Sequence, residues 1–498
     1  MSSSTATLTP GAVAPGVGAV AETRHRLAMD ALDVRRAMLD RAGRGDYWRW
    51  LAHVQAAAGC TRPVRLAGQI HTVDTGTGEV TSSRSTSDLP DAVIYKACGN
   101  RRAAVCPSCS ETYRADAYQL VLAGLAGGKG VPATAAGHSA VFATLTAPSF
   151  GPVHTRTASL KTGRLLPCHA DRRHPICAHG RRVYCGRRHS DGDQLLGQPL
   201  CPDCYDHRGQ AVWNASASEL WRRTRIGIDR AMTRHRPPGA PPVRVSYGKT
   251  AEFQRRGVVH YHAILRLDGI HPADPDAVLP PPEWASVFVL AHVLREAVAR
   301  TRYATVPHPD RPAGWVIGWG DPDKGLDIRP IRYPGDRHID RTAVAGYLAK
   351  YATKSTETTG HVSQRLTPAT IGLYADDTHP GRLIAAAWTL GRPAAGPEWT
   401  RLRRWAHQLG HGGHFFTKSR RYSTTFTVLR AARASWRRRH LERDRADQHQ
   451  ADAVVVVAAL EYAGLGWHTT GDALLANTSA ALARERRRAA RDEIRSSA

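Results

Sequence analysis

The chain has 498 residues, of which 42% are hydrophobic, so it is long enough to form several domains with buried cores. Its formal net charge of +26 favours a polyanionic partner, above all DNA or RNA, although a basic composition bias is the alternative explanation. No apolar run approaches the roughly 18 residues of a membrane span, and residues 1–22 lack the features of a secretory signal. We therefore expect a cytoplasmic protein without a membrane partner.

The N-terminal part of the chain predicts mostly helical structure. Residues 1–22, rich in Ser, Thr, Ala, Gly and Pro, are expected to form a disordered tail. Residues 23–135 are expected to form a helical region, with helical patterns from Ala21 to about Gly59 and from Glu111 to Leu125.

Residues 127–129, Gly-Gly-Lys, superficially resemble a phosphate-binding loop. The full motif is Gly-x-x-x-x-Gly-Lys followed by Ser or Thr, and Ala123 and Gly130 stand where its first glycine and its hydroxyl residue belong. We therefore expect no nucleotide cofactor, so that unwinding of a duplex would require a host helicase.

Residues 136–356 show the pattern of an α+β domain. The elements expected there are a strand at 140–146, a helix at 216–235, strands at 243–254 and 258–267, a helix at 281–302, a strand at 326–331 and a helix at 340–355. This order is the split βαβ pattern of a ferredoxin-like antiparallel sheet, with the cysteine- and histidine-rich segment 151–210 inserted after its first strand. Residues 357–498 are expected to be basic and mostly helical, with one strand near Tyr422 to Thr427.

The strand at 258–267 carries two histidines. Side chains two residues apart on a strand face the same way, so His260 and His262 should emerge side by side as half of a divalent-metal site. The alternative is a pair of surface or hydrogen-bonded histidines. On the preceding strand, Glu252 or Gln254 could supply a third ligand, and two imidazoles with one carboxylate suit Mg²⁺ or Mn²⁺ acting on a phosphodiester. A surface glutamate in a hairpin is the alternative for Glu252.

The helix at 340–355 presents two phenols and two ammonium groups together. At about 100° per residue, one narrow sector holds Tyr347, Lys350, Tyr351 and Lys354. A different, apolar sector would pack on the sheet. Nearby cations favour the phenolate form of a tyrosine and would also hold a phosphate, although a tyrosine pair at this spacing often only packs.

Three ordered segments resemble the motifs of HUH rolling-circle replication initiators, the two-tyrosine form most closely. They are Phe-Ala-Thr-Leu-Thr-Ala-Pro at 142–148, Glu-x-x-Arg-Arg-Gly-x-x-His-Tyr-His at 252–262 and Tyr-x-Ala-Lys-Tyr-x-x-Lys at 347–354. Further segments at 98–102, 106–109, 199–204 and 413–420 are similar to the replication initiator of actinobacterial plasmids and integrative elements. Relaxases place the tyrosine before the histidine motif, so the order here favours an initiator. Tyr261 departs from the commonest form of the histidine motif but is apolar enough to face the core.

This resemblance implies that His260 and His262 bind the metal and that Tyr347 and Tyr351 are nucleophiles. One tyrosine would nick single-stranded or hairpin origin DNA, leaving a 5′-phosphotyrosine and a 3′-OH primer for the host polymerase, and the other would serve rejoining. The chain would then be a metal-dependent, site-specific DNA endonuclease and strand transferase. The alternatives are a relaxase or transposase with the same chemistry, or a non-enzymatic zinc-stabilised DNA-binding regulator.

The cysteines predict structural zinc. Nine cysteines without an export signal favour metal ligation over disulfides, and Cys106-x-x-Cys109 and Cys201-x-x-Cys204 are two zinc knuckles. The pairing is left open for the residues that could complete these sites, which are Cys98, Cys168, Cys177 and Cys185, with His169, His179 or His189 as substitutes. Cys60 is left over as a core thiol. The zinc is expected to fix the insert and an origin-binding surface.

Basic residues near aromatic ones predict a track for DNA phosphates. The residues expected to contact DNA are Arg255, Arg256, Lys418, Arg420 and Arg421. The alternative for the C-terminal ones is a solvated helical face over an aromatic core.

Overall fold

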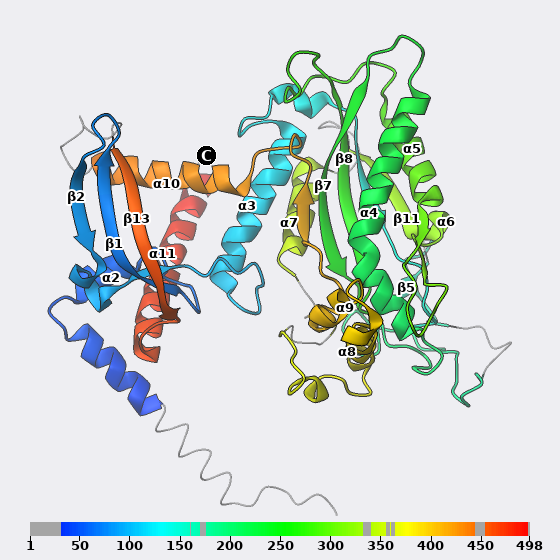
Figure 1. Ribbon diagram of the computed structural model, residues 1–498, viewed down its shortest axis with the longest axis horizontal. Coiled ribbons are helices and arrows are strands. Elements are labelled where there is room, and N and C mark those ends of the chain that lie inside the picture. The colour runs from blue at the N-terminus through cyan, green and yellow to red at the C-terminus, as the bar shows by residue number, and fades with distance from the viewer. Residues whose placement is uncertain are drawn as a thin grey trace, which may run out of the picture. The chain divides into compact units, whose positions relative to one another are not determined.

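The computed structural model describes residues 31–159, 161–169, 176–331, 340–354, 359, 364–443 and 454–496. The expected tail, 1–22, lies outside these residues. The chain divides into two compact units, of which the first comprises Met1–Asn100, Val105–Cys109 and Glu442–Ala498, and the second comprises Arg101–Ala104 and Ser110–Leu441 (Figure 1). Within the described residues, none of the helices combines the length and the apolar character needed to span a bilayer.

The first unit is built on an antiparallel sheet whose central strand is β1 (Val64–Asp74). This strand pairs with β13 (Val454–Leu465) along its whole length, and also with β2 (Val80–Ser85) and β3 (Ile94–Lys96). The helices of this unit are residues 31–42, α2 (Tyr47–Val54) and α11 (Thr470–Ser496). A small core forms around the buried side chains of Trp50, Val54 and Tyr95.

The sequence patterns of the terminal regions predicted helices but not the strands β1, β2, β3 and β13 of this sheet. The strand β1 has its longest partner in β13, almost 400 residues later, so the pairing leaves little trace in the local sequence pattern. The apolar run that begins β13 is partly exposed, since Val455, Val456 and Val457 are each about half exposed.

The second unit contains a five-stranded antiparallel sheet. Its strands lie in the order β11 (Leu326–Ile331), β4 (Ala140–Leu145), β8 (Val259–Gly269), β7 (Val243–Phe253) and β12 (Phe416–Lys418). Along the chain, α4 (His207–His235) follows β4, α5 (Val287–Arg300) follows β8, and α7 (Arg341–Ala352) follows β11. The predicted α+β class, with an antiparallel sheet between helices, is therefore confirmed.

The two faces of this sheet pack against different helices (Figure 1). Odd-numbered residues of β8, such as Tyr261 and Leu265, are fully buried in a core with α4 and α5. Ile264 faces the other way, into a core with α7 and with α3 (Pro107–Ala126). Because side chains alternate along a strand, His260 and His262 belong to the α7 face.

The remaining elements of the second unit are short or peripheral. They are β5 (Thr157–Ala158) and β6 (Leu165–Leu166) in the insert, β9 (Arg302–Ala304), β10 (Val316–Gly318), α6 (Pro322–Gly325), α8 (His379–Leu390), α9 (Thr400–Arg404) and α10 (Phe426–Arg443). The strand expected near Tyr422 to Thr427 is wrong, because the strand is β12 and α10 already begins at Phe426. Tyr422 is fully buried and donates its hydroxyl to the carbonyl of Val121, so its apolar character reflects core packing.

Candidate active site and metal-binding clusters

Glu252, His260 and His262 meet on one face of the β7–β8 hairpin. The register pairs Glu252 with His260 and places His262 one step further along the same face. The Nε2 atoms of His260 and His262 lie 3.1 Å and 3.3 Å from the same atom, Oε2 of Glu252. One ligand atom from each of the three residues lies within 4.8 Å of the others. Two imidazole nitrogens and a carboxylate oxygen therefore converge as they would around one cation.

The neighbouring strand β4 fixes the ring of His262. Thr144 is paired with His262 in the sheet, and its Oγ1 lies 3.1 Å from Nδ1 of the imidazole. The ring of Phe142 stacks on the same imidazole, with centroids 5.8 Å apart and an interplanar angle of 5°. Together they hold Nε2 toward Glu252, which is how a second contact orients a metal-ligating histidine.

Gln254, the alternative third ligand, lies behind the histidines. Its Nε2 is 3.4 Å from Nδ1 of His260, on the side of the ring away from Glu252. Its Oε1 accepts a hydrogen bond from Nε of Arg256. Of the two residues, Glu252 therefore joins the histidines in one cluster, whereas Gln254 contacts the far side of His260.

The helix α7 brings both tyrosines beside the histidines. Leu348 and Ala352 are fully buried on one side of this helix, whereas Tyr347 is 39% exposed on the other. The hydroxyl of Tyr347 lies 3.5 Å from Nε2 of His262. The ring of Tyr351 is centred 5.6 Å from His262 and 4.5 Å from Tyr347.

The two lysines of α7 differ in their relation to this site. Nζ of Lys354 lies 3.7 Å from Oε1 of Glu252 and 4.6 Å from the ring centre of Tyr351. Lys350 is exposed and its Nζ is 5.9 Å from the ring centre of Tyr351. Lys354 is therefore the closer cation to the carboxylate and phenols.

Burial and hydrogen bonding set the protonation of the site. Burial of Glu252 raises its carboxyl pKa, but the hydrogen bonds with His260 and His262 outweigh this and leave the pKa below its usual range. Burial lowers the pKa of His262, which keeps its ring neutral and able to act as a ligand. Burial raises the pKa of both Tyr347 and Tyr351, so each phenol needs nearby positive charge to ionise at neutral pH.

A groove of about 1350 Å³ opens over the site. Its lining includes Glu252, His260, Tyr347, Tyr351 and Lys354, together with residues 151–156, 191–194 and 196–198 of the cysteine-rich insert. Both the reacting groups and the insert are therefore accessible to one extended ligand.

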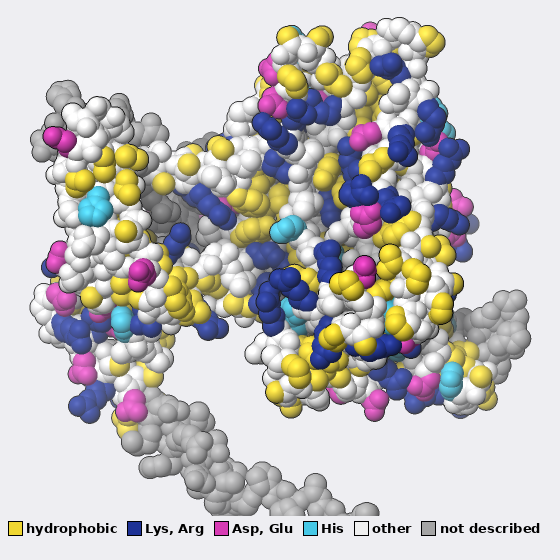
Figure 2. All heavy atoms as spheres, in the orientation of Figure 1, with side chains coloured by type: hydrophobic (Ala, Val, Ile, Leu, Met, Phe, Trp, Pro, Cys, Tyr) yellow, Lys and Arg dark blue, Asp and Glu magenta, His cyan; other side chains and the backbone are white. Residues whose placement is uncertain are grey.

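The basic residues expected at DNA fall into two places. Arg255 and Arg256 line the groove, where Arg255 donates hydrogen bonds to the carbonyls of Asp191 and Asp193 in the insert. The other three lie outside the groove lining: Lys418 donates to the carbonyl of Ser423 at 2.6 Å, while Arg420 and Arg421 form ion pairs with Asp276. On the viewed face, Figure 2 shows Lys and Arg side chains scattered over both units rather than confined to one patch.

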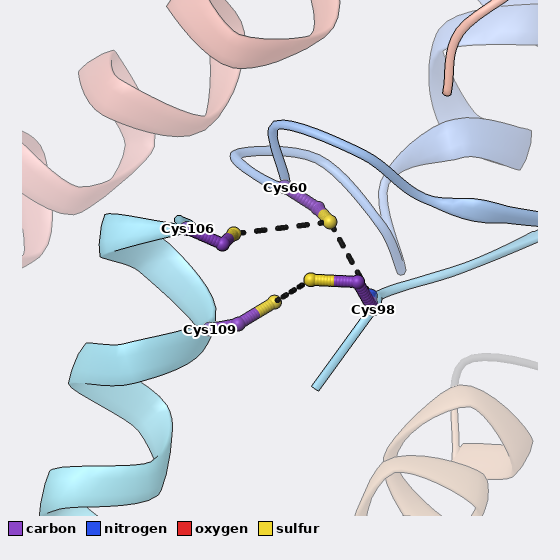
Figure 3. A group of neighbouring side chains, drawn as sticks. All are labelled: Cys60, Cys98, Cys106 and Cys109. Atoms are coloured by element: carbon purple, nitrogen blue, oxygen red, sulfur yellow. Dashed lines mark hydrogen bonds between the residues drawn. The ribbon is translucent and has the colours of Figure 1, made fainter. Parts of the chain in front are cut away.

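All nine cysteines fall into three clusters of four metal-binding side chains. The clusters are Cys60, Cys98, Cys106 and Cys109 in the first unit (Figure 3), and His154, Cys168, Cys185 and His189, and Cys177, His179, Cys201 and Cys204, in the insert of the second. Within each cluster the ligand atoms lie within 4.8 Å of one another, and all nine cysteines are free thiols. The clusters are compatible with zinc binding.

The clusters revise the open assignments of the sequence. Cys60 joins a cluster instead of standing alone in the core. His179 is the fourth member beside three cysteines, and His189 lies with a second histidine, His154, beside two. His169 stays outside, with Nε2 2.7 Å from the carbonyl of Val153. His154 was missed, because it stands apart from any Cys-x-x-Cys or His-x-x-x-His spacing and reaches its cluster through the fold of the insert.

Burial and backbone contacts act in opposite directions on the thiols of the first cluster. Burial of Cys106 raises its pKa, but hydrogen bonds from the backbone N–H groups of Thr61 and Cys109 outweigh this and lower the pKa to about 7. At Cys109 burial outweighs the backbone hydrogen bond from Gly99, and the pKa is raised to about 11.

Comparisons with known proteins agree with this combination of motifs. Residues 46–481 match the family described as replication initiator protein, pSAM2. The chain is 41% identical over 464 residues to a curated replication initiator protein of Streptomyces ambofaciens, a match that covers 90% of this chain and 93% of the relative. No solved structure matches it. The matched span contains the histidines, the tyrosines and all three clusters, and the chain belongs to the family of pSAM2-type replication initiator proteins.

Proposed function

We propose that this replication initiator nicks and rejoins one strand of origin DNA at the Glu252–His260–His262 site, as a rolling-circle HUH endonuclease. The observation that carries the proposal is the position of Tyr347, whose hydroxyl lies 3.5 Å from Nε2 of His262 at the edge of a groove. A nucleophile and a candidate metal site are thus placed where one phosphate could contact both.

The strand order supports a ferredoxin-like HUH domain. The strands of the strand–helix–strand–strand–helix–strand segment lie in the order fourth, first, third, second, as β11, β4, β8 and β7. This puts the histidine strand β8 in the interior of the sheet, where its neighbours on both sides restrain the two imidazoles. A rigid strand is a better support for a reacting centre than a loop.

Glu252, His260 and His262 would hold a divalent cation, Mg²⁺ or Mn²⁺, because mixed oxygen and nitrogen donors with open positions suit these ions. The donor set fits, since three lone-pair-bearing atoms face a common point and the ring of His262 is already oriented by Thr144. Bound there, the cation would polarise the scissile phosphate and favour ionisation of the attacking phenol.

The tyrosine performs the covalent step. Its Oη attacks the phosphorus in line with the leaving 3′-oxygen, so that a bond from phosphorus to Oη forms as the bond from phosphorus to O3′ breaks. The phenol proton is balanced by protonation of the 3′-oxygen. The products are a 5′-phosphotyrosine and a free 3′-OH, which a host polymerase could extend, and no nucleotide is consumed because one phosphoester replaces another.

The second tyrosine explains termination. The ring centres of Tyr347 and Tyr351 lie 4.5 Å apart, one helical turn from each other, so both can address the same phosphate position. After one round, the free phenol would attack the regenerated junction, and the newly released 3′-OH would attack the first phosphotyrosine to close the circle. Lys354, beside Glu252, would hold a non-bridging phosphate oxygen during both steps.

Covalent capture tests the proposal. A labelled hairpin oligonucleotide from the origin is incubated with the full chain and Mn²⁺ or Mg²⁺, and the adduct is separated on a denaturing gel. We expect an adduct with the unaltered chain and with Tyr462→Phe, an exposed tyrosine on β13, but none with the double variant Tyr347→Phe/Tyr351→Phe. An undiminished adduct with the double variant would refute the assignment, and no adduct with any variant would favour a DNA-binding regulator.

A further inference from the structure

The spacing of the ligand atoms in the three clusters is that of a coordination shell. Zinc bonds of about 2.3 Å to sulfur and about 2.05 Å to nitrogen give tetrahedral edges of about 3.8 Å between sulfurs, about 3.5 Å between sulfur and nitrogen and about 3.3 Å between nitrogens. In the first cluster, Sγ of Cys98 and Cys109 are 3.7 Å apart, and Sγ of Cys60 and Cys106 are 3.9 Å apart. Figure 3 shows these four side chains pointing toward one another, Cys106 and Cys109 from the start of α3 and Cys60 and Cys98 from two other stretches of chain.

The two clusters of the insert have the same dimensions. Nδ1 of His154 lies 3.8 Å from Sγ of Cys168 and 3.2 Å from Nε2 of His189. Nε2 of His189 lies 3.5 Å from Sγ of Cys185. In the other cluster, Nδ1 of His179 lies 3.2 Å from Sγ of Cys204 and 3.9 Å from Sγ of Cys201. Each edge is within a few tenths of an ångström of the tetrahedral value.

The hydrogen bonds around the His154 cluster leave its donor atoms facing inward. Nδ1 of His189 lies 2.7 Å from Oδ2 of Asp193, so the carboxylate accepts a hydrogen bond from Nδ1–H and leaves the Nε2 lone pair facing Cys185 and His154. The backbone N–H of Thr155 donates to Sγ of Cys168 at 3.1 Å from outside the cluster. Two ring nitrogens and two sulfurs directed at one point are the donor arrangement of a tetrahedral metal site.

We infer that the chain binds three zinc ions, with Cys60, Cys98, Cys106 and Cys109 forming one site, His154, Cys168, Cys185 and His189 a second, and Cys177, His179, Cys201 and Cys204 a third. Each site has four protein ligands, which is the closed arrangement of structural zinc. Every cysteine then belongs to one ligand set. Two of the three ions lie at the Cys-x-x-Cys knuckles, and the third lies at a site that contains no such knuckle.

The second of these ions stabilises a wall of the DNA groove. The groove that is lined by Glu252 and His260 is also lined by His154, Arg156, Asp191 and Asp193. Asp193 links the two parts, because its side chain contacts the ligand His189 while its carbonyl, with that of Asp191, accepts hydrogen bonds from Arg255 on the β7–β8 turn. This role of the second ion in the groove rests on the proposed function, whereas the three ligand sets do not depend on it.

Metal counting tests the ligand sets without reference to activity. The full chain is purified without chelator, and zinc per chain is measured by inductively coupled plasma mass spectrometry. We expect three zinc ions, and also three in the variant His260→Ala/His262→Ala, which lacks the candidate catalytic ligands. A count below three in the unaltered chain, or a loss of zinc in the His260→Ala/His262→Ala variant, would overturn the inference.

Single variants then assign the ions. Cys60→Ser, His189→Ala and His179→Ala should each leave two zinc ions, while His169→Ala, in the same insert but outside the clusters, should keep three. Retention of three ions by any of the first three variants would remove that residue from its ligand set. Because a zinc-site variant could fail to fold, cobalt replacement in the His260→Ala/His262→Ala variant provides a second measurement. We expect three tetrahedral cobalt ions with thiolate charge-transfer absorption, and octahedral cobalt in this variant would contradict the sites.

Binding of the origin oligonucleotide tests the role of the second ion in the groove. His189→Ala should weaken binding of the origin oligonucleotide at least tenfold, and Arg255→Ala should weaken it while keeping three zinc ions. If His189→Ala loses one ion but binds the oligonucleotide as the unaltered chain does, the link to the groove is refuted while the ligand sets stand. If the unaltered chain holds three ions but forms no covalent adduct, the proposed function fails instead.

Discussion

Thr144 offers a sharp test of how the site is held together. Its hydroxyl lies 3.1 Å from Nδ1 of His262 and the residue is half-buried in the interior strand β4, so Thr144→Val removes the contact while keeping a β-branched side chain of the same shape. Loss of such an outer contact to a metal-ligating histidine lowers metal affinity about 10- to 100-fold, or ~1.4 to ~2.8 kcal/mol. We expect a loss of metal affinity at the lower end of this range, because Phe142 still stacks on the imidazole of His262.

The assay is a Mn²⁺ titration of covalent capture. We expect the Mn²⁺ concentration for half-maximal adduct to rise about tenfold in Thr144→Val, with the rate at saturating Mn²⁺ close to that of the unaltered chain. Thr146→Val is the matched control, because Thr146 lies beyond the end of β4, where its backbone bonds to Gly320 and Gly325. An unchanged Mn²⁺ requirement combined with a lower saturated rate would refute the reasoning.

Three further predictions follow from the same contacts. Lys354→Met should slow adduct formation about tenfold, ~1.4 kcal/mol after allowing for the lysine's partial exposure, and more than Lys350→Met does in the same single-turnover assay. Tyr347→Phe should lower the yield of first cleavage more than Tyr351→Phe, because its hydroxyl is 3.5 Å from a metal-site nitrogen; equal yields would contradict this. Asp268→Asn should destabilise the second unit by about 3 to 5 kcal/mol in urea unfolding, because it strands the buried arginine two residues before it. Burial raises the pKa of Asp268, but hydrogen bonds from a histidine and that arginine lower it by more, so the net pKa is depressed. The stabilisation by Asp268 is therefore complete above about pH 4 and is lost as the pH falls through the depressed pKa. Thermal melts between pH 5 and 2 check this direction.

Local sequence patterns were sufficient to locate the centre of the second unit. Three patterns depend on residues close together in the chain: the alternation in β8, the turn at 255–257 and the apolar sector of α7. Together they bring Glu252, His260 and Tyr347 into one place. Both Glu252 and Gln254 could be the third residue of the site as far as the sequence shows. The pairing register of the β7–β8 hairpin was needed to show that Glu252 lies directly beside His260.

The metal clusters and the first unit depend on contacts that local patterns do not contain. Cys60 lies 38 positions before Cys98 and meets it through a loop after α2, and His154 reaches Cys185 only through the folding of the insert. The sheet of the first unit depends on β13 pairing with β1 from the other end of the sequence. The number of cysteines predicted metal ligation, whereas their grouping into three clusters required the tertiary structure.

The most direct measurement of the central claim is peptide mapping of the trapped protein–oligonucleotide adduct. The chain is captured on its origin hairpin, digested with a protease and analysed by tandem mass spectrometry. We predict a nucleotide linked through its 5′-phosphate to Tyr347 or Tyr351 within the α7 peptide. An adduct mapped to any residue outside that helix would contradict the assignment.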